Sequence, residues 1–384
     1  MSNREIPKGL RDLLPAEVKM MRSIEKKAGR LFHSYGYEEV ITPTFEYLEV
    51  VENGAGGNIR RELFLFMDRE GGILSLRPEI TVSIARLAAT HMQDALFPQR
   101  LFYQANVFRH VEPHLAQYRE FWQLGVELLG ASGVGADSEI ITMAVRVLQD
   151  IGLDNFKLSL NQIGIFNSLL EDSGMDPEER LLIRSLVESK DLVELARVLE
   201  KVAIDDGLKD TIAALPVLHG GLEVLSKIPW AEKNRNAATA VNELLKTYDA
   251  LKICGVQDKI VLDMGVLRGL DYYTGIVFEG YSPDLGYGLL GGGRYDNLMG
   301  KFGFPRPATG FSLGMDRLAL VLKNRDSEPQ RYLLGGRDFQ TLIDKAGKLR
   351  EEGYVVEMDI EGNSREDLEQ IAQARENCIL LYLD

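Results

Sequence analysis

The chain has 384 residues, and at roughly 150 residues per domain this length suits two or three domains. Hydrophobic residues make up 45% and charged residues 27%, a globular composition that excludes collagen-like repeats, general disorder and a disulfide scaffold. The formal net charge of −14 argues against a protein that coats nucleic acid by neutralising phosphates. The sequence has two cysteines and no secretory leader or membrane-spanning stretch, so we expect a cytoplasmic protein with free thiols.

Apolar spacing predicts alternating helices and strands over the first third of the chain. A helix is expected to begin at Pro15 and to end before Gly36, because proline suits the first turn of a helix and glycine its end. Two alternating strands joined by a polar loop follow further along. The predicted elements of this part are a helix over 15–34, a strand over 37–43, and strands over 101–109 and 120–129.

Residues 171–250 are predicted to form a mostly helical insertion. Asp176 and Pro177, followed by two glutamates, are typical of a helix start, with a capping side chain and acids near the positive end of the dipole. Short strands with many glycines return over 259–318, and a polar linker over 325–329 precedes the last segment. In that segment, strand and helix alternate, with elements expected at 332–334, 339–351, 355–359, 366–376 and 379–383.

Polar residues on the predicted strand 120–129 mark the first candidate site. Side chains alternate along a strand, so Gln123, Gly125 and Glu127 share one face, opposite an apolar face. Gln123 and Glu127 are expected about 13 Å apart, at ~3.3 Å per residue. Gly125 between them leaves a floor that a ligand can approach. A solvent-facing strand surface explains this strand alone equally well.

Two further motifs combine charged and aromatic side chains. Glu79 and Thr81 precede a helical run over 82–89, a pattern that on its own is most simply a helix N-terminus. Residues 268–275 place an arginine, an aspartate and two tyrosines between glycines, for which a turn with surface tyrosines is the plainer alternative. The run 286–291 matches the dinucleotide-binding glycine pattern literally, but no strand–helix unit surrounds it, so we reject that interpretation.

Together these segments resemble histidyl-tRNA synthetase, a class II aminoacyl-tRNA synthetase. The resemblance rests on 6–13 as the family's opening, 76–81, 108–127 as motif 2, 268–273 and 292–296 as the two histidine-specific peptides, and 310–317 as motif 3. It implies an α+β fold, in which residues 1–170 and 251–325 form a class II antiparallel sheet flanked by helices. The helical insertion then spans 171–250, and 331–384 resembles the first part of an anticodon-binding α/β domain.

The resemblance also implies a pocket for histidine. The implied contacts are Glu79, Thr81 and Gln123 for the ammonium, Glu127 and Tyr273 for the imidazole, Arg268 for the carboxylate, and Arg109 and Tyr272 as further pocket residues. Acids suit the ammonium and the ring N–H groups, and an arginine fork suits the carboxylate. Arg109 and Arg317 correspond to the family's ATP site. No catalytic residue, cofactor or metal is expected.

The chain departs from the synthetase pattern where ATP is bound. Val111 and Gln117 stand where the family has an adenine-binding glutamate and a phosphate-binding arginine. Asp316 replaces the usual glutamate of motif 3, Glu112 replaces an arginine and Ala116 replaces a glycine. Because phosphoryl-type chemistry depends on positioned positive charge, these changes predict a loss of adenylate formation.

Kept histidine contacts, altered ATP contacts and a shortened C-terminal segment resemble the family of ATP phosphoribosyltransferase regulatory subunits. This family implies a non-catalytic protein that a short catalytic subunit requires in the first step of histidine biosynthesis, with feedback control by histidine. The implied partners are that catalytic subunit, L-histidine as effector, and a second copy paired through the N-terminal part, within a hetero-oligomer; membrane and tRNA are not expected. Two alternatives stay open: an active histidyl-tRNA synthetase, and a synthetase-like sensor or ligase of another pathway.

Overall fold

The computed structural model describes residues 4–113, 116–171, 173–228, 230, 234–267, 272–322 and 330–383. The chain divides into two compact units, Met1–Lys323 and Asn324–Asp384, which we call the large unit and the C-terminal unit. Among the described residues, no helix combines the length and the apolar character that a bilayer span requires.

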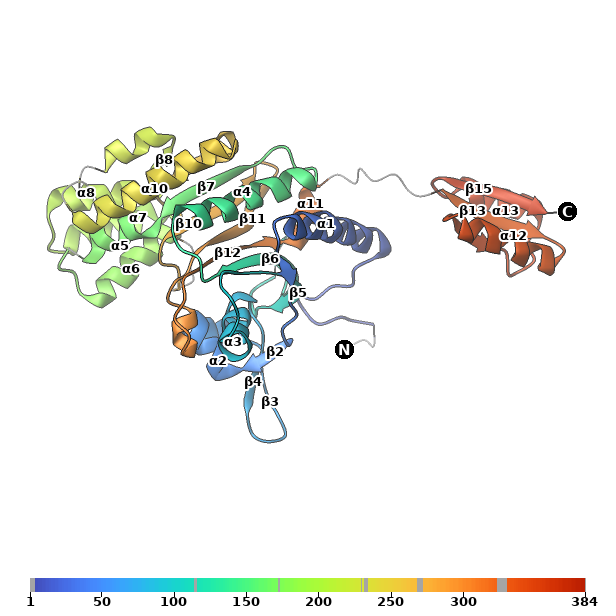
Figure 1. The fold of residues 1–384 in the computed structure, drawn as a ribbon, viewed down its shortest axis with the longest axis horizontal. Coiled ribbons are helices and arrows are strands. Elements are labelled where there is room, and N and C mark those ends of the chain that lie inside the picture. Colours follow the sequence, from blue (N-terminus) through green and yellow to red (C-terminus); the bar gives the residue numbers. More distant parts are fainter. Residues whose placement is uncertain are drawn as a thin grey trace. The chain divides into compact units, whose positions relative to one another are not determined.

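The large unit is built from many short strands and helices (Figure 1). Its strands are β1 (Glu38–Glu39), β2 (Phe45–Tyr47), β3 (Leu65–Met67), β4 (Ile73–Leu76), β5 (Gln99–Phe108), β6 (Glu120–Leu129), β7 (Lys157–Gln162), β8 (His219–Gly220), β9 (Ile260–Asp263), β10 (Ile276–Ser282), β11 (Leu285–Arg294) and β12 (Ala308–Gly314). Its helices are α1 (Pro15–Ser34), α2 (Leu48–Ala55), α3 (Thr81–His91), α4 (Val134–Asp150), α5 (Ile163–Glu171), α6 (Pro177–Glu188), α7 (Leu192–Lys201), α8 (Asp206–Ala214), α10 (Arg235–Ile253) and α11 (Met315–Val321). Short 3₁₀ helices cover Gly57–Glu62, Leu215–Val217, Leu222–Lys227, Gln257–Lys259 and Met299–Phe302.

A broad sheet forms the centre of the large unit. Within the described ranges it contains nine strands, in the order β1-β5-β6-β12-β11-β10-β7-β9-β8. Neighbouring strands run antiparallel, except that β1 is parallel to β5 and β7 is parallel to β9. On β12, Gly310 pairs with Glu127 of β6. This mostly antiparallel sheet with flanking helices confirms the predicted α+β class.

Hydrophobic cores lie on both faces of this sheet. Phe102 of β5 belongs to a large core shared with α1, α4, α5 and α10. Its neighbours Leu101 and Tyr103 belong to a second core shared with α2 and α3. Because successive strand residues point to opposite faces, these two cores sandwich the sheet. On β6, Val126 packs in the first core, so Glu127 points toward the second core and α3.

The predicted helix over 15–34 is confirmed as α1, with proline in the first turn as expected. The predicted strand over 37–43 is wrong in length, because only Glu38 and Glu39 join the sheet, beside β5. The chain then leaves the strand ladder, since the carbonyls of Thr42 and Pro43 accept hydrogen bonds from the guanidinium of Arg77. The strands predicted over 101–109 and 120–129 are β5 and β6.

A second, three-stranded sheet has the order β2-β4-β3 and projects below α2 and α3 in Figure 1. Large apolar side chains on it face solvent: Phe45, Tyr47, Leu65, Phe66, Met67 and Ile73 are each more than a third exposed. We call these six residues the apolar hairpin patch. By the strand register, Phe45, Tyr47 and Phe66 share one face of this sheet, and Leu65, Met67 and Ile73 share the other.

The helix start predicted at Asp176 and Pro177 is confirmed. Asp176 accepts a hydrogen bond from the backbone N–H of Glu179 at 2.9 Å, and the Glu179 side chain accepts one from the N–H of Asp176 at 3.1 Å. This reciprocal cap starts α6. Lys190, just beyond the end of α6, adopts the left-handed region at φ 54°, and Asp191 then caps α7. Further along, α10 packs on α4 and α5.

The C-terminal unit is a small parallel α/β layer. Its elements are β13 (Arg331–Gly336), α12 (Phe339–Glu351), β14 (Val355–Met358), α13 (Arg365–Gln373) and β15 (Cys378–Leu383). The strand order is β14-β13-β15, with both pairs parallel. Leu334 packs with α12 and the adjacent Leu333 packs with α13, so one helix covers each face. The strand–helix alternation matches the prediction.

Candidate functional site

Two acidic side chains, Glu79 and Glu127, line a small cavity of about 50 Å³ between β6 and the start of α3. Both are buried, with 5% and 1% of their surface exposed. The other lining residues are Thr81, Tyr103, Arg109, Gln123, Tyr272, Tyr273, Gly291, Tyr295, Gly310, Phe311 and Ser312. Seven of the eight residues predicted to bind histidine therefore meet at one cavity, which we call the diacid pocket. The eighth, Arg268, lies outside the described residues.

Glu127 is held by hydroxyl groups from two directions. Thr81 donates from Oγ1 to Glu127 Oε1 at 2.8 Å, and the Tyr295 phenol donates to Glu127 Oε2. Gly310 on the neighbouring strand makes room for this carboxylate, because a Cβ there would lie 1.9 Å from Glu127 Oε2. The glycine of motif 3 is thus needed for the position of the acid.

Glu79 has a structural and a polar role at once. One oxygen, Oε1, accepts a hydrogen bond from the backbone N–H of Val82 at 2.9 Å, in the first turn of α3. The other, Oε2, accepts one from the phenol of Tyr272 at 3.1 Å. The plain interpretation of this segment as a helix N-terminus is therefore compatible with a binding role. An acid at this position also suits the positive end of the helix dipole.

Tyrosine rings form much of the remaining wall. The ring centroid of Tyr272 lies 5.0 Å from that of Tyr273 and 5.7 Å from that of Tyr295. Tyr103 lies directly over Gly125, where a Cβ would be 2.5 Å from the phenol oxygen. The predicted open floor at Gly125 is therefore wrong, because the Tyr103 ring fills that space. The glycine makes room for a phenol.

Burial sets the charge state of the pocket. The pKa of Glu127 is raised to about 8: desolvation by burial is the largest cause and the neighbouring Glu79 also raises it, while the hydrogen bonds from Tyr295 and Thr81 lower it. Desolvation also raises the pKa of Glu79. With no ligand bound, Glu127 is therefore mainly protonated at neutral pH. A cation entering the pocket would favour the carboxylate, because opposite charge lowers the pKa of an acid.

Two more groups at the edge of the diacid pocket suit a polar ligand. The Gln123 side-chain oxygen is buried and accepts no hydrogen bond from the described residues. A buried acceptor without a donor costs about 1–3 kcal/mol, so this atom marks a place for a ligand N–H. Arg109 donates from Nε to the carbonyl of Pro78 at 3.0 Å, and it lines this cavity and both of its neighbours.

A second cavity, of about 310 Å³, adjoins the first through Arg109 and Gln123. This second cavity lies where the synthetase resemblance places ATP. One of the two arginines that line it, Arg317, is hydrogen-bonded to backbone carbonyls of the protein. Arg317 donates to the carbonyls of Ala116 and Gly288 at 3.2 and 2.7 Å. Ala116 adopts φ 65°, a left-handed conformation that glycine takes with less strain. The residue that replaces the family's glycine thus carries a carbonyl that holds this arginine.

Asp316, the acid of motif 3, also binds protein groups through both of its oxygens. Arg11 donates to Asp316 Oδ1 at 2.5 Å, and the other oxygen of Asp316 accepts the backbone N–H of Trp122 at 2.8 Å. Asp316 is 4% exposed. At the surface, Lys8 pairs with Glu112 at 2.8 Å. Two of the acids that depart from the synthetase pattern therefore pair with the N-terminal segment.

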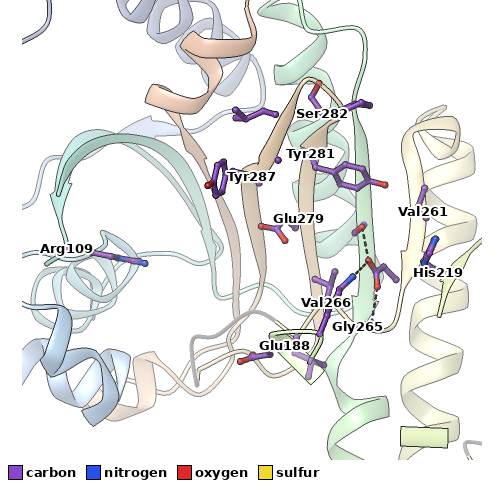
Figure 2. A pocket seen from close by; sticks show the side chains of 18 of the residues that line it. Arg109, Glu188, His219, Val261, Gly265, Val266, Glu279, Tyr281, Ser282 and Tyr287 are labelled. Carbon is purple, nitrogen blue, oxygen red and sulfur yellow. Dashed lines mark hydrogen bonds and ion pairs between the residues drawn. The ribbon is translucent and has the colours of Figure 1, made fainter. Parts of the chain in front are cut away.

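A third and larger cavity, of about 1000 Å³, opens along the sheet beside the insertion. Figure 2 shows Glu279 and Tyr287 between Arg109 on one side and His219 on the other, with Glu188 from the end of α6 below. Acids and bases are mixed along its lining, so its charge pattern indicates no single ligand class. Among the described residues, no cluster of side chains suits a metal ion.

The sequence prediction missed Tyr103 and understated Tyr295. Tyr103 lies on the predicted strand 101–109, where its alternation with Phe102 placed it on the same sheet face as Glu127. That pairing was the signal for it. Tyr295 belongs to the second histidine-specific peptide, but only the fold shows that its phenol reaches Glu127.

The fold has counterparts among known proteins. Residues 9–318 match the family model for histidyl-tRNA synthetase. The crystal structure of histidyl-tRNA synthetase from Nostoc sp. PCC 7120 has a TM-score of 0.84 and 22% identity, covering 100% of this chain and 93% of that one, which establishes the fold. Fold and site thus define a protein of the class II histidyl-tRNA synthetase type.

Closer relatives specify the family. The ATP phosphoribosyltransferase regulatory subunit of Moorella thermoacetica is 42% identical over 375 residues, 97% of this chain and 96% of that protein. The structure described as an ATP phosphoribosyltransferase regulatory subunit/histidyl-tRNA synthetase from Bacillus halodurans has a TM-score of 0.89 and 31% identity, and the match covers 100% of both chains. The chain belongs to the family of ATP phosphoribosyltransferase regulatory subunits.

Proposed function

We propose that this chain serves as a non-catalytic regulatory subunit and senses L-histidine in the diacid pocket. One observation carries the proposal: the buried acids Glu79 and Glu127 face a cavity beside an acceptor of Gln123 that has no donor among the described residues. Such acids are costly to desolvate unless a cationic partner compensates them. A ligand with an ammonium group and ring N–H donors supplies that compensation.

Free histidine matches the donors and acceptors of the pocket. Its ammonium suits Glu79 and the Gln123 oxygen, and its imidazole suits Glu127 beside Tyr273. Its carboxylate needs a cation, and Arg109 lies on the cavity wall, anchored through Nε to the carbonyl of Pro78. Arg268 remains the carboxylate partner implied by resemblance. Hydrogen bonds between charged partners are shorter and stronger than neutral ones, which favours this ligand over neutral amides.

The ATP-type cavity supports the non-catalytic part of the proposal. Phosphoryl chemistry requires arginines and acids aimed at the reacting phosphate and its metal. Here Arg317 binds backbone carbonyls and Asp316 binds Arg11. Val111 and Gln117 line the same cavity in place of a glutamate and an arginine. We therefore expect no adenylate formation.

The proposed partners follow from this role. A subunit without chemistry of its own acts by assembling with the short catalytic subunit of ATP phosphoribosyltransferase, in the cytoplasm, where we expect histidine to be made. We propose that the apolar hairpin patch pairs two copies of this chain within that assembly, because its exposed side chains include Met67 at 72% and Tyr47 at 57%. Histidine would then shift the complex between active and inhibited states by binding one state more tightly.

Calorimetry with L-histidine on the wild type and on Glu127→Ala tests the pocket directly. We expect saturable binding by the wild type and a loss of at least about tenfold in the variant, since removing one charged hydrogen-bond partner is worth about 1.5–3 kcal/mol. Equal binding by both proteins would move the effector site elsewhere. Histidine-dependent ATP–pyrophosphate exchange by the purified chain would instead support the alternative of an active synthetase.

A further inference from the structure

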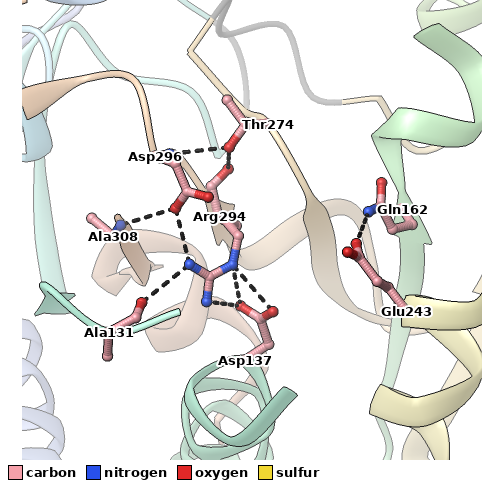
Figure 3. Close-up of polar contacts among 8 residues, drawn as sticks. All are labelled: Ala131, Asp137, Gln162, Glu243, Thr274, Arg294, Asp296 and Ala308. Atoms are coloured by element: carbon pink, nitrogen blue, oxygen red, sulfur yellow. Dashed lines mark hydrogen bonds and ion pairs between the residues drawn. The ribbon is translucent and has the colours of Figure 1, made fainter. Parts of the chain in front are cut away.

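Behind the diacid pocket lies a buried arginine that no binding role explains. Arg294 ends β11 and is 7% exposed. Figure 3 shows its guanidinium surrounded by polar groups from separate segments of the chain. Gly275 makes room for its stem, because a Cβ there would lie 3.0 Å from Arg294 Cδ. A side chain packed this closely fixes the position of what it touches.

The guanidinium of Arg294 joins the start of α4 and the connection before it to Asp296 of its own segment. Its Nε donates to Asp137 of α4 at 3.0 Å, and Nη2 lies 2.8 Å from the same carboxylate. Its Nη1 donates to the carbonyl of Ala131, just beyond β6, at 3.1 Å and to Asp296 at 2.9 Å. The backbone carbonyl of Arg294 accepts the N–H of Thr274 at 2.8 Å.

The segments around Arg294 carry walls of the diacid pocket. Thr274 directly follows Tyr273, Tyr295 directly follows Arg294, and Ala131 follows the strand that presents Glu127. The Asp296 carboxylate, which binds the Arg294 guanidinium, also accepts the backbone N–H of Ala308 at 3.1 Å. Arg294 itself does not line the cavity. Its contacts therefore reach the ligand only through other residues.

We propose that Arg294 is a positioning residue for the effector pocket: its guanidinium ties the connection after the strand of Glu127 to the segment of Tyr295 at the spacing that histidine requires, and its backbone carbonyl binds the segment that follows Tyr273. This inference rests on the proposed function, because it takes the diacid pocket as the histidine site. Lysine cannot replace this arginine. Asp137, Ala131 and Asp296 surround the planar guanidinium, and the single ammonium of lysine cannot reach all three.

The test compares Arg294→Lys with a control arginine on β5 whose acid partner also lies on α4. Arg100 pairs with Glu139 of α4 through Nε and Nη2, both at 3.0 Å, and Glu139 also accepts the phenol of Tyr37. None of these three residues lines the diacid pocket. Arg100→Lys thus changes a partly exposed ion pair to α4 whose side chains do not line the pocket.

Calorimetric affinity for L-histidine and the unfolding temperature are measured on both variants and the wild type. We expect Arg294→Lys to lose about tenfold or more in affinity, the effect of about 1.4 kcal/mol, and Arg100→Lys to lose less than about twofold. Unfolding temperature alone does not separate the two variants, so the affinity is the deciding readout. Wild-type affinity in Arg294→Lys would overturn the positioning role while leaving the proposed function intact.

A milder variant covers the case in which Arg294→Lys does not fold. Thr274→Val removes the hydroxyl that accepts the N–H of Asp296 at 3.0 Å, at the rim of the same network. We expect a loss of about threefold to tenfold in histidine affinity, as for one neutral hydrogen bond. Unchanged affinity in Thr274→Val would contradict the inference. No binding of histidine by the wild type would overturn the proposed function and this inference together.

Discussion

Replacing Glu127 by glutamine should change how the stability of the protein depends on pH. The pKa of Glu127 is about 8 in the folded, ligand-free protein, against an ordinary value of 4.5. The folded state therefore holds a proton at this site that the unfolded state releases above pH 4.5. Stability from this group is present at low pH and is lost as the pH rises from the unfolded to the folded pKa. Glutamine cannot titrate, so Glu127→Gln removes this dependence.

The size of the effect follows from the two pKa values. Between about pH 6 and about pH 8 the wild type should lose about 2 kcal/mol from this one group, an order-of-magnitude figure obtained by integrating the proton linkage. The side-chain amide in the Glu127→Gln variant resembles the protonated acid, since its oxygen accepts a hydrogen bond from one of the two hydroxyls of Thr81 and Tyr295 and its N–H donates to the other, so the two proteins should be closest in stability below the ordinary pKa of 4.5. The variant should be the more stable protein near the higher pH.

Urea unfolding of both proteins across this pH range, followed by tryptophan fluorescence, measures the difference. Comparing the proteins at each pH cancels most of the contribution of Glu79, whose pKa is also raised by burial and which both proteins retain. The expected result is a gap that widens by about 2 kcal/mol in favour of the variant. A gap that stays constant, or that favours the wild type at higher pH, would refute the account of Glu127 as a buried, protonated acid.

Other predictions concern single contacts. Glu79→Gln should weaken histidine binding by about 10- to 150-fold in calorimetry, because a charged hydrogen-bond partner is lost; retention of wild-type affinity would exclude Glu79 from the ammonium site. Gly310→Ala should abolish histidine binding, since the added Cβ would displace the Glu127 carboxylate. An unchanged calorimetric titration with histidine would show that the carboxylate can move. Arg11→Met should lower the free energy of unfolding by about 2–3 kcal/mol by leaving Asp316 buried without its cation; an unchanged urea midpoint would argue that the pair is not stabilising. Met67→Lys should shift a dimer toward monomer in sedimentation velocity, and a persistent dimer would place the contact elsewhere.

The sequence predicted elements best where a local signal defines their ends. Helix α1 has a proline at its start and a glycine beyond its end, and α6 has a complete capping box, so both begin where expected. The short β1 shows the opposite case. The strand predicted there continues to Pro43, but the Arg77 guanidinium binds carbonyls at Thr42 and Pro43, a contact from a residue more than thirty positions away.

The candidate site divides in the same way. Glu79, Gln123 and Glu127 are visible as polar residues beside apolar runs, but only the resemblance to histidyl-tRNA synthetase implied a binding role for them. Their contacts depend on strand register: Gly310 beneath Glu127 arises from pairing between distant strands, and Tyr103 meets Gly125 only through the register of the β5–β6 hairpin. The positioning network at Arg294 depends likewise on α4 and on the turn before β10, which no spacing in the sequence brings together.

The most direct test of the account measures the rate of ATP phosphoribosyl transfer by a short catalytic subunit alone, with this chain, and with this chain plus L-histidine. The same series is run with Glu127→Gln. The account predicts that both forms of the chain raise the rate, and that histidine lowers it with the wild type but much less with the variant. Equal inhibition by histidine with both forms would contradict the claim that the diacid pocket is the sensor, and an unchanged rate in the presence of the wild type would contradict its role as a regulatory subunit.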